Sequence, residues 1–300
     1  MICMRETLTS TNYIKEILLL IKNGDSDEGS KYGNNTYSQD KNVIVKIFNS
    51  TNSKSYADIL ARLTLIDSMY STQMNRRYYA LEEIATKLHE YSQKYDLAKW
   101  FIELAKNPEK ITDLDLFASK YGIDKKCNKK GVAISLISKY AYFETKFNFP
   151  IYDSIACEMI PDIWKYCEWD EIPKYIIYEG NTLKVKGDDT IIAFIKTINK
   201  LIDKLGGNIS YDHLDRLLWF VGKIRRGNLS LVLNKELYCK TYDIYKSKTG
   251  NKDIFYIGNI SLNYLQYLKE DTVLFEFFNL AKTLEKKYPT KKEKKVKKQI

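Results

Sequence analysis

The sequence predicts an all-α protein with a small mixed α/β extension near its C-terminus. Only 13 Gly and 5 Pro punctuate its 300 residues, and so few breakers favour long helices over a many-stranded sandwich or barrel. Apolar residues make up 44% and charged residues 29% of the chain, which is typical of a globular protein. Apolar side chains also recur at steps of three and four residues, the period of an α-helix.

The first expected helix spans residues 11–23 and ends at Gly24. Residues 24–42 are polar and indicate a loop, and a short apolar run, 43–48, precedes a second helix that starts near Ser55. Between residues 56 and 88 the helical spacing is interrupted near Ser71, which predicts two helices. Further helices are expected at 94–106, 113–121, 131–143, 153–167, 190–205 and 211–226.

The remaining segments define the expected domain organisation. Residues 172–189 indicate a loop or small hairpin, residues 253–257 a short strand, and residues 261–287 a final helical pair. We therefore divide the chain into an N-terminal helix with a polar loop (1–55), a helical core (56–226), a C-terminal extension (227–288) and a basic tail expected to be disordered (289–300).

Several chemistries lack the residues that they need. The chain has no C-x-x-C pair and only two histidines, so neither a metal site nor a cofactor is expected. The longest apolar run, Ile17–Ile21, is too short to cross a bilayer, and no secretory signal precedes it. We expect a soluble, cytoplasmic monomer that does not bind membranes.

The positive charge is concentrated at the C-terminus. The formal net charge is +10, but residues 286–300 hold eight Lys and one Glu, so the rest of the chain carries only about +3. Such a tail can raise the affinity for any polyanion without reading sequence. It can equally serve only to keep the chain soluble.

The most informative segment runs from Gly131 to Ile155. A helix of about 13 residues leads to the turn F-P-I-Y-D-S, in which Asp153 begins the next helix. An Asp at this position usually caps a helix. The segment nevertheless resembles the helix-hairpin-helix DNA glycosylases, closest to their bacterial 8-oxoguanine-glycosylase-like branch. In that family a glycine hairpin opens a helix and a catalytic Asp follows about twenty residues later, so the resemblance implies Asp153 as the catalytic carboxylate.

Two further segments carry the same resemblance. Residues 63–88 resemble the first core helix of the family, which implies that Tyr70 fills the gap left by a flipped base and that Arg76 and Arg77 hold phosphates. Tyr70 is equally explained as an ordinary aromatic residue at the boundary of the core, and Arg76 and Arg77 as solvated residues at the start of a helix. Residues 214–223, L-D-R-L-L-W-F-V-G-K, resemble the closing helix. The resemblance implies two helical lobes within 56–226 around a cleft, onto which residues 147–153 open.

The sequence departs from the family pattern at two places. The hairpin K-K-G-V-A lacks the second glycine, so Lys129, Lys130 and Gly131 are its remaining candidates for DNA contact, with Lys125 and Lys126 as further positive charges. Ser135 stands where bifunctional relatives place a nucleophilic Lys. Lys139 lies four residues further on, on the same helix face, and is a second candidate catalytic residue.

These features lead to three hypotheses. The first is a DNA glycosylase that hydrolyses a damaged or modified base from double-stranded DNA, in base-excision repair or in antiviral defence. The second is a DNA-binding module on the same fold without catalysis. The third is a helical protein-interaction protein with no role on DNA.

Overall fold

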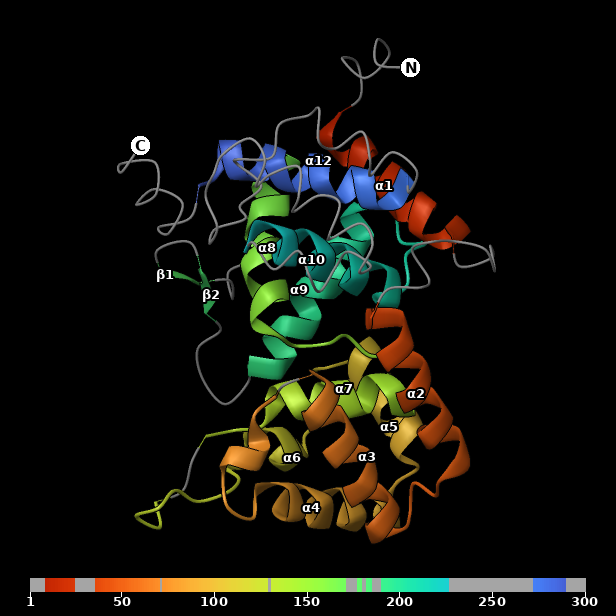
Figure 1. The fold of residues 1–300 in the computed structure, drawn as a ribbon, viewed down its shortest axis with the longest axis vertical. Coiled ribbons are helices and arrows are strands. Elements are labelled where there is room, and N and C mark those ends of the chain that lie inside the picture. The colour runs from red at the N-terminus through yellow and green to blue at the C-terminus, as the bar shows by residue number, and fades with distance from the viewer. Residues whose placement is uncertain are drawn as a thin grey trace, which may run out of the picture.

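A computed structural model describes residues 9–24, 36–70, 72–128, 131–170, 177–179, 182–184, 190–226 and 272–289. In these ranges the protein is almost entirely helical, which confirms the all-α prediction for this part of the chain. The helices form two groups, which we call the first and the second lobe, at the bottom and the top of Figure 1.

The first lobe is one continuous piece of chain. It comprises α2 (Thr36–Ser50), α3 (Tyr56–Tyr70), the 3-10 turn η3 (Met74–Arg76), α4 (Ala80–Lys94), α5 (Leu97–Lys106), α6 (Asp115–Ala118) and α7 (Ile134–Glu144). Helix α7 lies against α2, α3 and α5, and nine of its 11 residues are buried. It is therefore a central helix, and its polar residues Ser138 and Lys139 are enclosed with the apolar ones.

The second lobe is assembled from both ends of the chain. It comprises α1 (Ser10–Gly24), α8 (Ser154–Tyr166), the antiparallel strands β1 (Ile177–Glu179) and β2 (Thr182–Lys184), α9 (Thr190–Lys204), α10 (Tyr211–Arg225) and α12 (Thr272–Lys287). Helix α10 packs against α1, α8 and α12. Gly222 lets α8 approach closely, because a Cβ at this position would overlap Cγ2 of Ile155.

Polar groups join the two lobes. Nζ of Lys41 on α2 lies 2.6 Å from Oδ1 of Asp212 on α10, and the Tyr142 hydroxyl on α7 donates to the same oxygen. Nδ2 of Asn199 on α9 donates to the carbonyl of Ala105 on α5, at 2.8 Å. The lobes thus meet through specific hydrogen bonds as well as through the connecting segment 145–153.

Some sequence-based boundaries were wrong. Residues 36–42, expected in a polar loop, form the first half of α2. Lys41, Ile44 and Phe48 recur at helical spacing, with Lys41 and Ile44 buried, and this packing overrides the strand preference of the β-branched residues around them. The helix expected at 113–121 is only the four-residue α6. The predicted strand at 253–257 lies outside the described residues.

No helix in the described ranges is both long and apolar enough to cross a bilayer.

Candidate active site

Asp153 begins helix α8 and uses only one of its carboxylate oxygens to do so. Its backbone is extended (φ −145°, ψ 167°), and Oδ1 accepts hydrogen bonds from the backbone N–H groups of Ile155 and Ala156, each at 2.8 Å. This is an ordinary helix cap. Oδ2 has no hydrogen-bond partner among the described residues, and the side chain is half-buried. One oxygen therefore stabilises the helix while the other stays available.

The segment before Asp153 is fixed against α7. The Oγ of Ser138 accepts a hydrogen bond from the Tyr152 backbone N–H at 3.0 Å. Lys146 and Phe147 both adopt positive φ (51° and 71°), so the chain reverses tightly after α7. These contacts hold Asp153 beside the middle of α7, which carries the other candidate residues.

Lys139 is the charged residue at the centre of this arrangement. Its side chain is buried (3% exposed), and Nζ donates to Oγ of Ser135 at 2.8 Å. Burial lowers the pKa of Lys139, and the nearby carboxylates of Asp153 and Asp215 oppose this effect. The amine and the Asp153 carboxylate are therefore close enough to interact electrostatically.

Tyr70, the last residue of α3, also lies close to this lysine. The centroid of its ring is 5.8 Å from Nζ of Lys139 and 6.0 Å from the ring of Phe143, which it meets edge to face. Buried Asp67, one turn earlier, holds the following segment by accepting hydrogen bonds from Thr72 and from the N–H groups of Met74 and Asn75. Tyr70, Ser135, Lys139 and Asp153 thus come together from three helices.

The second lobe adds residues to which sequence reasoning gave no catalytic role. Burial lowers the pKa of Lys223 on α10; Asp153 opposes the effect, while Arg226 and Lys139 increase it. Nζ of Lys223 is 5.3 Å from the ring centroid of Trp219. The spacing of four residues between Trp219 and Lys223 places both on one helix face, but nothing local indicates that this face lies near Asp153.

The remaining predicted site residues that the structure describes, Arg76, Arg77 and Gly131, lie on two adjoining loops of the first lobe. We define loop one as residues 72–79 and loop two as residues 119–128 with 131–133. Arg76 is exposed and Arg77 half-buried in loop one, and Nη1 of Arg77 donates to the Gly131 carbonyl at 2.9 Å. No heavy atom lies within 4 Å of a Cβ built on Gly131, so this position does not require glycine. Lys129 and Lys130 lie outside the described residues.

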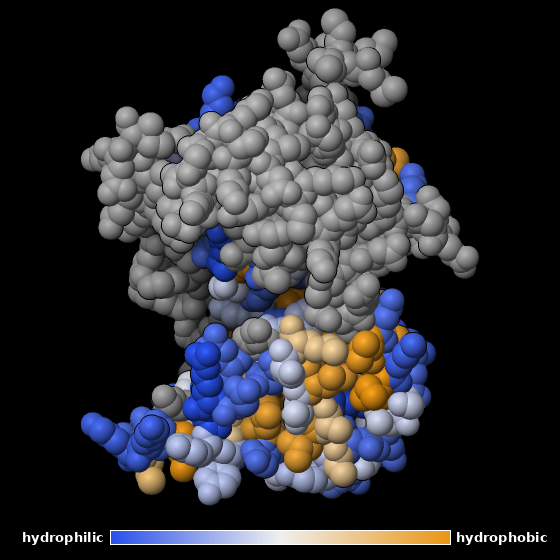
Figure 2. Space-filling model, viewed as in Figure 1, coloured by the Kyte–Doolittle hydropathy of each residue, from blue (hydrophilic) through white to orange (hydrophobic). Residues whose placement is uncertain are grey.

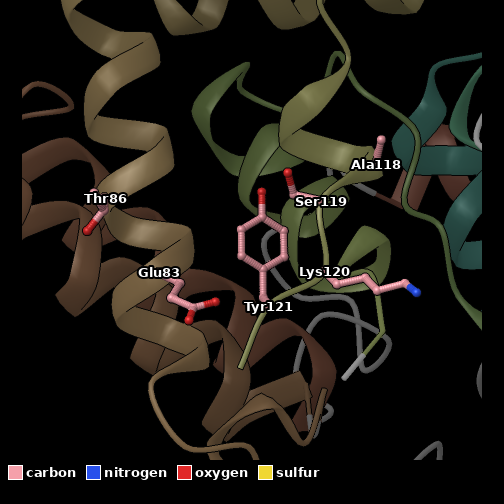
Figure 3. Close-up of a pocket in the computed structure, with 6 residues that line it drawn as sticks. All are labelled: Glu83, Thr86, Ala118, Ser119, Lys120 and Tyr121. Atoms are coloured by element: carbon pink, nitrogen blue, oxygen red, sulfur yellow. The ribbon is translucent and has the colours of Figure 1, made fainter. Parts of the chain in front are cut away.

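A shallow pocket of about 660 Å3 adjoins loop two (Figure 3) and is lined by none of the candidate active-site residues. Its polar groups serve the fold. Oε2 of Glu83 accepts from the Gly122 N–H at 3.0 Å, the Tyr121 hydroxyl donates to the Leu116 carbonyl at 2.7 Å, and Lys120 points away from Glu83. The Glu83 contact anchors loop two on α4, and the Tyr121 contact anchors it on α6.

In the described ranges, no group of three His, Cys, Asp or Glu side chains is arranged to hold a metal ion. Burial raises the pKa of the Cys157 thiol to about 12 and that of Cys167 to about 11, so both are protonated at neutral pH.

Comparison of the sequence and the structure with known proteins found no matching family model, no matching curated protein and no matching solved structure.

Proposed function

We propose that this protein is a DNA N-glycosylase that extrudes a damaged or modified base from double-stranded DNA and releases it by hydrolysis. The observation that carries the proposal is the position of Asp153, which has one carboxylate oxygen not used by its helix, within electrostatic reach of the buried amine of Lys139. The resemblance of residues 63–223 to the helix-hairpin-helix glycosylases supports the same reaction.

The chemistry follows from the bond to be broken. When an N-glycosidic bond breaks, the base leaves with the bonding electron pair and the sugar becomes a cation resembling an oxocarbenium ion. The free oxygen of Asp153 stabilises this cation and accepts a proton from the attacking water. Tyr70 fills the gap left by the extruded base, because a planar side chain replaces part of the lost stacking.

The mechanism is hydrolytic rather than covalent. Ser135 occupies the position at which bifunctional relatives carry a nucleophilic Lys, and Lys139 donates its hydrogen bond to that serine. The Lys139→Gln protein should retain much of its base release and give no borohydride-trapped adduct with abasic DNA. If the parent protein forms such an adduct and the Lys139→Gln protein does not, the reaction proceeds through an imine on Lys139 instead.

The proposal is tested by replacing Asp153 with Asn, because Asn caps a helix as well as Asp does. Duplex oligonucleotides with single modified bases are incubated with protein, and abasic sites are detected by alkaline strand cleavage. Genomic DNA from cells and from phages with modified bases extends the search, with released bases identified by mass spectrometry. Excision should fall about 100-fold or more in Asp153→Asn, while folding and DNA binding persist.

Asp96 provides the matched control. It caps α5 by accepting from the Lys99 N–H at 3.2 Å, so Asp96→Asn makes the same chemical change at a helix start that does not belong to the site. This variant should retain full excision. Equal excision by Asp153→Asn and the parent would exclude the proposed mechanism.

A non-catalytic DNA-binding module is the second candidate, and the capping bonds of Asp153 favour it because they give this residue a structural role. Salt-dependent DNA binding without base release from any substrate would identify this second function.

A further inference from the structure

We propose that loops one and two form a platform that binds a locally unpaired DNA strand, with phosphates on the cationic side chains and bases stacked on Tyr78 and Tyr79. This inference rests on the proposed function in that its partner is DNA. It names a surface outside the candidate active site and the form of DNA that this surface fits.

The first observation is the exposure of two consecutive aromatic side chains. Tyr78 is 54% and Tyr79 64% exposed, whereas Tyr140 and Tyr142 of α7 are fully buried. Tyr79 has φ 60°, in the left-handed region that bulky residues rarely adopt. Strained conformations of this kind persist where the surrounding structure enforces them, and they concentrate at functional sites.

The second observation is that the two loops are held together although their side chains are exposed. Tyr78 and Ile123 exchange backbone hydrogen bonds of 3.1 and 3.0 Å. Gly122, at φ 72°, packs so closely that a Cβ would lie 2.7 Å from that of Arg77. Oδ1 of Asp124 accepts hydrogen bonds from the backbone N–H groups of Lys126 and Asn128, which fixes the turn of loop two. The tyrosines therefore project from a preorganised base, which reduces the entropy lost on binding.

The third observation is the charge around the tyrosines. The described cations of the two loops are Arg76, Arg77, Lys120, Lys125 and Lys126, and none of them forms an ion pair with a described residue. Two carboxylates at these loops, those of Asp124 and Glu83, accept hydrogen bonds from backbone N–H groups of loop two. In Figure 2 the loop that projects at the lower left, between α6 and α7, is mostly hydrophilic.

Aromatic rings interleaved with unpaired cations match single-stranded DNA better than duplex. Every base has a flat face that can stack on a tyrosine ring, but in a duplex these faces are covered by neighbouring bases. Loop one follows directly after Tyr70, so a strand opened by base extrusion would lie next to the platform.

The test measures fluorescence anisotropy of labelled oligonucleotides with the full-length protein. The probes are a 20-nucleotide single strand, the matched duplex, and the same duplex with a three-nucleotide bulge. The Tyr78→Ala/Tyr79→Ala protein should bind the single strand and the bulged duplex about tenfold or more weakly, with little change for the matched duplex. The Tyr78→Phe/Tyr79→Phe protein should bind like the parent, because phenyl rings still stack.

Tyr56→Ala is the matched control, since Tyr56 is also exposed (38%) and lies outside both loops; it should bind all three probes normally. Unchanged single-strand affinity in Tyr78→Ala/Tyr79→Ala overturns the platform, as does an equal loss for all three probes, which would indicate charge alone. If the protein releases a base and the Tyr78→Ala/Tyr79→Ala variant binds the single strand like the parent, the platform is rejected and the glycosylase proposal is retained. If the variant loses single-strand binding and the parent releases no base from any substrate, the platform is retained and the glycosylase proposal is rejected.

Discussion

Lys41 and Asp212 form a buried ion pair that connects the two lobes, with 2.6 Å between Nζ and Oδ1. Arg216 contributes a second cation, with Nη2 2.5 Å from Oδ2 of Asp212, and the ring of Phe147 lies 4.0 Å from Nζ of Lys41. Asp212 thus compensates two positive charges at the boundary between the lobes.

Removing this carboxylate should destabilise the protein more than removing one of its partners. Asp212→Asn removes the negative charge that faces both Lys41 and Arg216 and should lower the free energy of unfolding by about 3–5 kcal/mol. Lys41→Met should cost less, because Arg216 and Tyr142 still bind Asp212. Urea denaturation at pH 7 measures both, and an equal loss in the two variants would contradict the central role of Asp212.

The same carboxylate should contribute to acid sensitivity. Burial alone would raise the pKa of Asp212, but the charges of Lys41 and Arg216, with hydrogen bonds from Lys41 and Tyr142, lower it overall. A carboxyl with a lowered folded-state pKa stabilises the fold above its unfolded pKa, about 3.9. This contribution is lost as the pH falls through the folded value. Denaturation between pH 7 and 2 should therefore show a shallower acid-dependent loss in Asp212→Asn.

Lys139→Met should stabilise the protein at neutral pH. Burial lowers the pKa of Lys139, so at pH 7 the folded state carries a penalty for the charged amine that Met does not have. The penalty diminishes as the pH rises toward the unfolded pKa, about 10.4, because the amine then deprotonates in both states. We expect a gain in the free energy of unfolding at pH 7 that narrows by pH 10. A gain independent of pH would mean that packing, not charge, causes it.

Two glycine variants should behave oppositely. Gly222→Ala inserts a methyl group where Cγ2 of Ile155 lies, and Cγ of Met159 is only 3.0 Å away. Overpacking of this kind costs about 1–3 kcal/mol and would displace the start of α8, next to Asp153. Gly131→Ala meets open space and should be neutral or slightly stabilising. Thermal denaturation compares them, and a destabilised Gly131→Ala would contradict the described geometry of loop two.

The basic tail should affect affinity but not turnover. Deleting residues 290–300 keeps α12 and the Tyr288 carbonyl, which accepts from Arg225 at 2.8 Å. DNA binding should weaken alike for all sequences, and the slope of log K against log salt should decrease by about 0.9 for each lysine that contacts phosphate. Base release at saturating protein should be unchanged. Lost turnover at saturation would place part of the active site in the tail.

Local sequence patterns predicted the helices that have one apolar face or that begin with a capping side chain. Helices α8 and α10 begin after Asp153 and Ser210, whose side chains accept hydrogen bonds from their own first turns, and both agree with the expected ranges within a residue. Helix α4 instead begins at Ala80, after a turn that buried Asp67 and the backbone pairing of Tyr78 with Ile123 hold in place. Such distant partners leave no periodic signal in the local sequence.

In the candidate site, too, contacts within one helix could be predicted from the sequence, whereas contacts between helices could not. Ser135 and Lys139 are one helical turn apart, so their contact could be expected from spacing alone. The approach of Lys223 to Asp153 could not, because it depends on how α10 crosses α8 at Gly222. A single glycine within a helix indicates close packing but does not identify the partner.

The discontinuous second lobe has a consequence for synthesis on the ribosome. The first lobe occupies one uninterrupted stretch, whereas α1 must wait for α10, about 190 residues later, and for α12, about 250 residues later, to complete its packing. Translation at about 5–20 residues per second makes this delay roughly 12–50 s. The apolar face of α1, with Ile14, Ile17 and Ile21, is exposed to the cell during that interval. Nascent chains of this protein should therefore require chaperone protection early, and truncated chains that lack α12 should aggregate.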